Sequence, residues 1–248
     1  MREPKVALCF VVWNQRAGCE HDLPNIDLKK FDEVFAIDGG STDGTVEVFE
    51  SYAVPVYRQP RKSLNAAYWH AVEMTRCEHI LVFFPKGTLD PKILQVMSGK
   101  LRQGYQLVIP TRVSKGGRNE EDDKIFRPRK WGINVLARIA SLLWRREGDL
   151  ISDVLHGVKG FTRSAFLLMR PSESGVTIDL EMVVRAYRLH LARCEFPVTE
   201  TSRPWNTTHF KLLPTGIRLA KFLWSELWRS APVEAPAADA AGSERSAS

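Results

Sequence analysis

Five short apolar runs, the first four of which are followed by segments expected to form helices, constrain the fold of this 248-residue chain most strongly. The runs are 5–13, 33–38, 54–57, 80–84 and 107–110. Continuous apolar runs of this length are typical of strands that are buried on both faces, and such strands belong to parallel sheets with helical connections. The alternation therefore predicts an α/β fold of the Rossmann-like kind, with a mostly parallel sheet flanked by helices.

The second half of the chain follows a less regular pattern. Helices are expected at 131–146, 179–190 and 215–229, and a further strand at 193–199. The first and last of these helices are amphipathic and combine Trp with Arg and Lys, so the chain is predicted to end its folded part in an amphipathic helix. The Ala-, Pro- and Ser-rich tail 231–248 is predicted to be disordered.

Cysteine spacing and the distribution of apolar residues indicate in which cellular compartment the protein is found. The four cysteines are scattered without a C-x-x-C pair, which argues against a zinc site and fits a reducing compartment. The N-terminus carries no signal-peptide pattern, and no apolar run approaches the roughly 20 residues that span a bilayer. We expect a cytoplasmic protein, or one that lies peripherally on the inner face of the cytoplasmic membrane.

The net charge of +6 is concentrated in one segment. Residues 100–146 contain 12 Lys or Arg against 4 Asp or Glu, so this segment carries +8 and the remainder −2. Such a segment binds phosphate groups or anionic lipid, or is simply a solvated basic face, and both interpretations stay open. Nucleic acid is not expected as a partner, because the segment lacks interleaved aromatic residues and any known nucleic-acid-binding pattern.

An acidic glycine turn follows the second predicted strand, with the sequence Asp38-Gly39-Gly40-Ser41-Thr42-Asp43-Gly44-Thr45. Ligands of open α/β sheets bind at the carboxyl ends of the strands, where this turn lies. The Asp38 carboxylate can accept hydrogen bonds from a base or a ribose, and the glycines allow the backbone to approach a flat base. The turn therefore predicts a nucleotide pocket, although an ordinary tight turn has similar residues.

These motifs resemble glycosyltransferase family 2, whose members have the GT-A fold. The matching segments are Val11-Val12-Trp13-Asn14, the turn 38–45, Arg61-Lys62-Ser63-Leu64-Asn65-Ala66-Ala67 and Gly87-Thr88-Leu89-Asp90-Pro91. The later chain is similar to the polyprenyl- and dolichyl-phosphate sugar synthases. The segments that carry this likeness are Pro110-Thr111-Arg112, Arg127-Pro128-Arg129-Lys130-Trp131, 152–161, Thr177-Ile178-Asp179-Leu180-Glu181 and Glu195-Phe196-Pro197-Val198.

The resemblance implies transfer of a sugar from a nucleoside diphosphate sugar to an acceptor, a polyprenyl phosphate at an anionic membrane surface. One GT-A domain is expected over 1–230, with a nucleotide-binding half (1–110) and an acceptor-binding half (111–230). A catalytically degenerate sugar-nucleotide-binding or membrane-scaffold protein is the alternative.

The resemblance also implies roles for individual residues. The nucleotide-sugar-binding residues would be Asn14, Asp38, Gly40, Asp43 and Arg61. The acceptor-phosphate-binding residues would be Arg112, Arg127 and Arg129, because guanidinium groups suit phosphate. The catalytic residues would be Asp153 and Glu181, joined by Lys86, which is not a family residue but stands where the family has its metal-binding pair. A hydroxyl acceptor would need one of the two carboxylates as a general base, whereas a lipid phosphate is already anionic.

The family's acidic metal-binding pair is missing. An Asp-x-Asp that holds Mg²⁺ or Mn²⁺ is expected just before Gly87, but the chain has Phe84-Pro85-Lys86 there. No metal ligand is therefore assigned, and the need for a divalent metal stays open. Three interpretations remain: Lys86 supplies the positive charge on the diphosphate, the chain binds a sugar nucleotide without turnover, or Lys86 is a surface residue of an inactive site.

Overall fold

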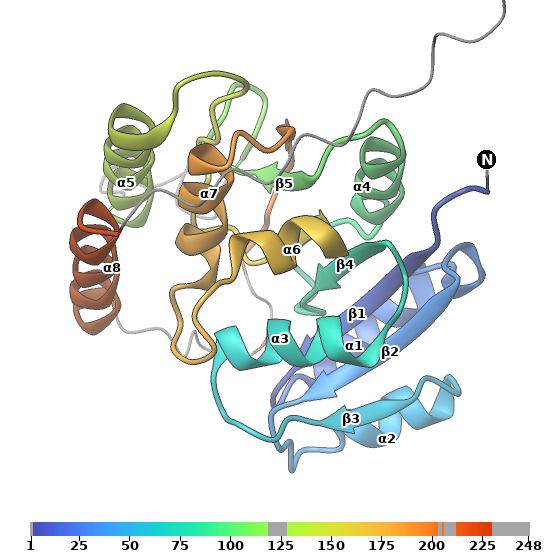
Figure 1. Ribbon diagram of the computed structural model, residues 1–248. Helices are drawn as coiled ribbons and strands as arrows, with labels where there is room; N and C mark the ends of the chain where they lie inside the picture. The colour runs from blue at the N-terminus through green and yellow to red at the C-terminus, as the bar shows by residue number, and fades with distance from the viewer. Residues whose placement is uncertain (1, 119–127, 203–204, 206–211, 230–248) are drawn as a thin grey trace, which may run out of the picture.

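The structure is a computed structural model that describes residues 2–118, 128–202, 205 and 212–229 (Figure 1). A seven-stranded sheet has the order β3-β2-β1-β4-β6-β5-β7 and carries helices on both faces. The predicted fold class is thereby confirmed. The predicted tail 231–248 lies outside the described residues, and the division into two functional halves stays a prediction.

The strands are β1 (Val6–Val12), β2 (Glu33–Asp38), β3 (Val56–Arg58), β4 (His79–Phe83), β5 (Leu107–Thr111), β6 (Lys159–Thr162) and β7 (Arg193–Pro197). The α-helices are α1 (Arg16–Asp22), α2 (Thr45–Ser51), α3 (Leu64–Met74), α4 (Ile93–Arg102), α5 (Pro128–Trp144), α6 (Arg163–Met169), α7 (Ile178–Arg188) and α8 (Leu212–Leu227). Two short 3₁₀ helices, Leu23–Asn25 and Leu28–Lys30, connect α1 to β2.

Strand β6 departs from the parallel pattern, because it runs antiparallel to both β4 and β5. The other neighbours in the sheet pair in parallel. Helix α6, which the sequence analysis did not predict, follows β6 directly and begins where the Thr162 hydroxyl accepts a hydrogen bond from the Ala165 backbone (3.2 Å). The reversal places the start of β6 at the edge where the other six strands end.

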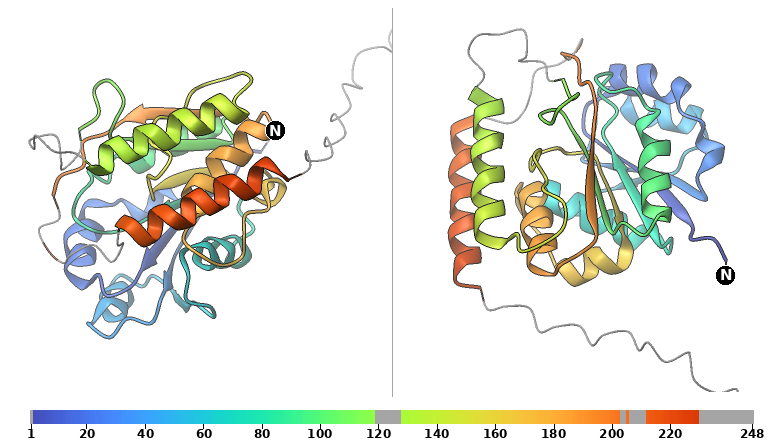
Figure 2. Two further views of the ribbon diagram at one scale, coloured as in Figure 1. Left: turned by 90° about the vertical axis from the view of Figure 1, so that its left-hand side faces the viewer. Right: turned by 90° about the horizontal axis from the view of Figure 1, so that it is seen from above.

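The sheet buries a hydrophobic core on each face, as expected for strands that are apolar throughout. Along β1, Cys9 and Val11 belong to one core, which α3, α6 and α7 cover. Leu8 and Phe10 belong to the other core, which α1, α2 and α4 cover. Figure 2 shows the sheet between these two helical layers.

Helices α5 and α8 lie on the outer side of α7 and so form a third layer on one side of the molecule (Figure 2). Each directs small or apolar residues to the first core, among them Ala140 of α5 and Phe222 of α8. Each also exposes a second apolar stripe, in which Leu142 is 82% and Trp228 is 75% exposed. Within the described ranges, no helix is long and apolar enough to cross a membrane.

Candidate functional site

The side chains predicted for the site come from loops at one edge of the sheet. Asn14 follows β1, Asp38 ends β2, Lys86 follows β4 and Arg112 follows β5. Lys159 joins them at the start of β6, because this strand is antiparallel to its neighbours. Residues that are far apart in the sequence therefore meet where ligands of open α/β sheets bind.

The acidic glycine turn is built around the Asp38 carboxylate. Asp38 accepts hydrogen bonds from the backbone of Gly40 (2.9 Å) and from the backbone and hydroxyl of Ser41 (3.0 and 2.6 Å). Asn14 joins the turn to the end of β1, since its side-chain oxygen accepts from the Thr42 backbone at 2.9 Å. Gly40 has φ +94°, a conformation that strains residues with a side chain. The turn is thus held in one shape.

Asp43 joins the turn to two helices. Its carboxylate accepts hydrogen bonds from the backbone of Thr45, in the first turn of α2, and of Arg16, which begins α1 (both 3.1 Å). Partial burial opposes ionisation, but hydrogen bonds from Thr45 and Arg16 hold the pKa of Asp43 below its ordinary value. Asp43 therefore positions backbone at the edge of the site.

Two cations lie beside the turn. A methyl group added at Gly40 would lie 3.7 Å from Arg58 Nη2 and 3.8 Å from Lys62 Nζ. The turn and Arg58 also line a hollow of about 420 Å³ between α2 and β3. Arg61, the predicted binding residue, instead pairs with Glu173 at 3.0 Å on the surface. Lys62 lies in the segment 61–67 that resembles the family, without a predicted role, and Arg58 lies outside the matching segments.

The loop that carries Lys86 is held in place from two sides. The Gly87 backbone donates a hydrogen bond to the buried Asp22 carboxylate at 3.0 Å. The Thr88 hydroxyl donates to Glu200 at 3.1 Å. Lys86 Nζ lies 4.7 Å from the centre of the Phe84 ring, a favourable cation–π distance. The replaced metal motif is therefore an ordered cationic loop.

Arg112 and Asp153 form a buried, bidentate ion pair. Arg112 Nε and Nη2 donate to the two Asp153 oxygens at 2.7 and 2.9 Å, and Nη1 donates to Glu200 at 2.8 Å. Asp153 is fully buried. Burial alone would raise its pKa, but the Arg112 guanidinium lowers the pKa of Asp153 to about 2. Asp153 is therefore ionised and its charge is matched by Arg112.

A second ion pair joins Lys159 to Asp179, in the first turn of α7. Lys159 is fully buried, and its Nζ lies 2.9 Å from Asp179 Oδ1. Burial raises the pKa of Asp179, and the positive charges of Lys159 and Lys86 partly oppose this rise. Burial opposes the ionisation of Glu200, but the positive charge of Arg112, supported by that of Lys86, holds the pKa of Glu200 below its ordinary value. Lys86 therefore acts electrostatically on the carboxylates of the second half of the chain.

The comparisons with known proteins agree with this architecture. A model of the family described as "Glycosyl transferase family 2" matches residues 21–168, more than half of the chain. The chain belongs to glycosyl transferase family 2. It is 29% identical over 207 residues to "Glycosyltransferase AglJ" from Haloferax volcanii, which covers 83% of this chain. The chain spans 65% of the length of that relative.

Solved structures with a similar fold include glucosyl-3-phosphoglycerate synthase from Mycobacterium tuberculosis in two complexes. One complex, with Mn²⁺, uridine diphosphate and phosphoglyceric acid, matches with a TM-score of 0.71. The match covers 91% of this chain and 79% of the synthase chain. The other complex, with Mn²⁺ and UDP-glucose, matches with a TM-score of 0.69. The match covers 90% of this chain and 78% of the synthase chain. Both are 18% identical to the family 2 chain, so they show its fold alone.

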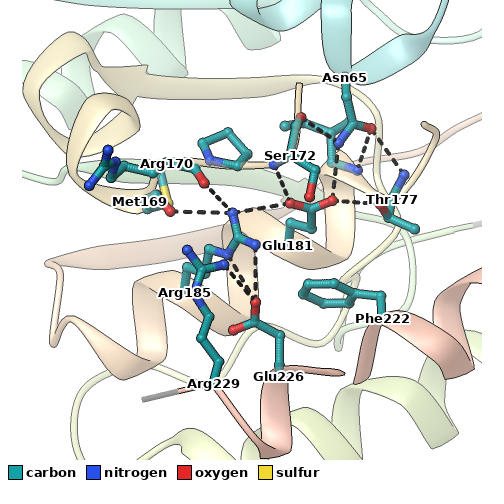
Figure 3. A network of polar contacts seen from close by, with 12 residues as sticks. Asn65, Met169, Arg170, Ser172, Thr177, Glu181, Arg185, Phe222, Glu226 and Arg229 are labelled. Atoms are coloured by element: carbon teal, nitrogen blue, oxygen red, sulfur yellow. Dashed lines mark hydrogen bonds and ion pairs between the residues drawn. The ribbon is translucent and has the colours of Figure 1, made fainter. Parts of the chain in front are cut away.

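Glu181 of the family 2 chain lies inside a buried polar network (Figure 3). One of its oxygens accepts from the Asn65 amide (3.0 Å) and the other from the Ser172 backbone (2.7 Å). Arg185 lies 3.1 Å from Glu181 and 3.0 Å from Glu226 of α8. Glu181 thus connects the start of α3, the segment before α7 and the outer helix, and it is fully buried.

The donor set at this edge does not fit a divalent cation. Residues 84–86 supply an ammonium group instead of carboxylates, and Arg112 and Lys159 pair with Asp153 and Asp179. Among the described residues, no group of three or more His, Cys, Asp or Glu could hold a metal ion. The family 2 chain therefore presents cations where a metal-binding pair is expected.

Two predicted acceptor residues cannot be placed. Arg127 lies outside the described residues, and Arg129 is in the first turn of α5 with a side chain that is also outside them. The structure adds Lys159, Asp179 and Glu200 to the site of the family 2 chain. Lys159 and Asp179 lie within segments that carry the family likeness, but their roles there were not predicted. The pairing partners of the three residues lie 20 to 88 positions away in the sequence and so leave no local pattern.

Proposed function

We propose that the chain transfers a sugar from a nucleoside diphosphate sugar to a polyprenyl phosphate at a membrane surface. The observation that carries this proposal is the set of cations at the carboxyl edge, with Arg58 and Lys62 beside the acidic glycine turn and Lys86 in the loop after β4. Such cations suit a reaction in which both substrates carry phosphate. Membership of glycosyl transferase family 2 supports the sugar transfer.

In this proposal, the nucleoside lies on the glycine turn. Three donors address the Asp38 carboxylate, which leaves capacity for one further hydrogen bond from a base or ribose. Asn14, Gly40 and Asp43 hold the turn in shape. Trp13, which is 45% exposed and packs against Gly39, offers an aromatic face for stacking.

The diphosphate is proposed to lie between the cations beside the glycine turn and Lys86 in the loop after β4. Arg58 and Lys62 lie beside the turn, with Arg61 next to them in the chain. Lys86 would neutralise the charge that develops on the leaving nucleoside diphosphate. A preorganised ammonium group can stabilise this charge without a metal, although as a single charge it does so less strongly than a divalent cation.

The environment of Asp153 favours an anionic acceptor. Arg112 matches the charge of Asp153, so proton abstraction by Asp153 would break a buried ion pair. A phosphate acceptor needs no general base. Because Arg112 is engaged by Asp153 and Glu200, the attraction of the phosphate is proposed to come mainly from Arg127 and Arg129. Glu181 is equally engaged, by Asn65 and Arg185, and is proposed to position the site.

The outer face of α5 and α8 is proposed to contact the membrane. This face exposes Trp131, Leu142, Trp224 and Trp228. Exposed basic residues accompany the apolar ones, namely Arg138, Arg145, Arg146, Arg218, Lys221 and Arg229. Apolar residues can enter the headgroup region while Arg and Lys attract anionic lipid.

Replacing Trp224 and Trp228 together with serine is expected to weaken binding to anionic lipid vesicles about 10- to 100-fold, because each Trp buries a large apolar area. Co-sedimentation with phosphatidylglycerol vesicles measures this. Serine at Tyr52 and Tyr57, which are exposed aromatics in the other half, should leave binding unchanged. Equal binding by both double variants would contradict membrane contact through α8.

The whole proposal is tested by transfer of radiolabelled sugar from UDP-glucose, UDP-N-acetylglucosamine or GDP-mannose to a short-chain polyprenyl phosphate. Transfer is expected and should persist in EDTA, because the donor set does not fit a divalent cation. Loss of activity in EDTA would overturn the role of Lys86 in place of a metal. Sugar-nucleotide binding without transfer would instead support the degenerate alternative.

A further inference from the structure

His156 is buried at the carboxyl edge of the sheet with one ring nitrogen unpaired. The residue is 2% exposed. Its Nδ1 lies 3.3 Å from the Val158 carbonyl oxygen, so Nδ1 carries the hydrogen that this contact requires. Nε2 then presents a lone pair, and none of the described residues donates a hydrogen bond to it. A buried acceptor without a donor is unfavourable and needs an explanation.

The ring is neutral under physiological conditions. Burial, assisted by the positive charge of Arg112, lowers the pKa of His156 to about 4. The neighbouring carboxylates Asp153 and Glu200 act in the opposite direction but do not compensate. Nε2 can therefore accept a hydrogen bond but cannot donate one.

Two cations act electrostatically on His156, the partly exposed Arg112 and the buried Lys159, and both donate their hydrogen bonds elsewhere. Arg112 directs its nitrogens to Asp153 and Glu200. Lys159 directs its ammonium group to the His156 carbonyl oxygen and to Asp179. A role as metal ligand is not supported, because the described part of the chain contains no suitable cluster of ligands. Among the described residues none supplies the donor that Nε2 needs, and a bound molecule can supply it.

The backbone around His156 is held firmly next to the Lys86 loop. Lys159 binds the carbonyl oxygen of His156, and the Tyr68 hydroxyl binds that of Gly157. A methyl group at Gly157 would lie 3.3 Å from the Phe84 ring, over which Lys86 lies. The backbone of His156 is thus fixed beside the place proposed for the diphosphate.

We propose that His156 Nε2 accepts a hydrogen bond from a hydroxyl group of the transferred sugar and so contributes to sugar specificity. This inference rests on the proposed function. A deprotonated phosphate oxygen does not fit the position, because it has no hydrogen to donate. Nε2 is enclosed by neighbouring atoms, so a hydroxyl group reaches it only after local side-chain movement.

Isothermal titration of His156→Leu and His156→Gln tests the inference. The ligands are UDP, GDP, UDP-glucose, UDP-N-acetylglucosamine and GDP-mannose, and the sugar nucleotide that the unmodified chain binds most tightly is compared with its own nucleoside diphosphate. His156→Leu should weaken binding of the sugar nucleotide about 5- to 100-fold and leave the affinity for the nucleoside diphosphate unchanged. His156→Gln should retain most of the affinity, because its side-chain oxygen can occupy the position of Nε2.

The outcomes separate the two proposals. If the unmodified chain binds none of the five ligands, the proposed function fails and the role of His156 falls with it. If it binds them but His156→Leu weakens both ligands equally, or neither, only the role of His156 is overturned. Thermal unfolding of each variant verifies that a change in affinity does not reflect loss of the fold.

Discussion

Replacing Lys86 with methionine lowers kcat/KM for sugar transfer by about 100- to 1000-fold, the range expected when one preorganised charge-stabilising group is removed. Methionine retains most of the volume and length of lysine but not its charge. The loop that carries residue 86 is fixed by Asp22 and Glu200, so the effect should come from the missing ammonium group. Initial rates with a nucleoside diphosphate sugar and a polyprenyl phosphate measure it.

Two further variants define the role of this charge. Lys86→Arg keeps the charge and should retain activity within about tenfold of the unmodified chain. Lys92→Met removes an exposed lysine from the following helix region and should have little effect. Full activity of Lys86→Met would show that Lys86 does not contact the reacting diphosphate.

Replacing Arg112 with alanine lowers the free energy of unfolding by about 3–5 kcal/mol, because it leaves the buried Asp153 carboxylate without its counter-charge. Urea unfolding followed by circular dichroism measures the change. Adding Asp153→Asn to this variant should restore part of the loss, since a neutral amide is less costly to bury than an unpaired carboxylate.

The same ion pair predicts how stability depends on pH. The pKa of Asp153 falls from its ordinary value of 3.8 to about 2 in the folded chain, so the pair contributes about 2 kcal/mol. Because the pKa is lowered on folding, this contribution is present above pH 4 and is lost as the pH falls towards 2. Asp153→Asn should remove this part of the acid dependence.

An exposed ion pair provides the comparison for these measurements. Arg102 pairs with Glu3 at 3.0 Å, and both side chains are substantially exposed. Arg102→Ala should therefore change the free energy of unfolding by less than about 1 kcal/mol. An equally small effect of Arg112→Ala would contradict the assignment of a buried, desolvated pair.

Structural features that depend on residues close together in the sequence could be predicted from it. The apolar runs identified the strands, and the turn 38–45 identified the edge where β2 ends. Helix α6 was missed because its seven residues are too few to show a clear period. The antiparallel direction of β6 was also missed, since a short strand carries no local sign of its direction.

Sequence motifs predicted some residues of the candidate site but not the ion pairs between them. Asp153 and Glu181 were predicted as catalytic carboxylates, and those roles stay untested. Their sequence positions gave no sign that Arg112 and Arg185 match their charges. Arg58 was not singled out, because nothing in the local pattern distinguishes it from Arg61.

By itself, the sequence determined the α/β alternation, the acidic glycine turn and the presence of Lys86 where an acidic pair is expected. These are local properties, since strand burial and turn conformation depend on residues close in the chain. Only the tertiary structure decided which charges neutralise one another at the carboxyl edge. Pairing and desolvation depend on distances through space, and those distances exist only after the strands have been assembled into the sheet.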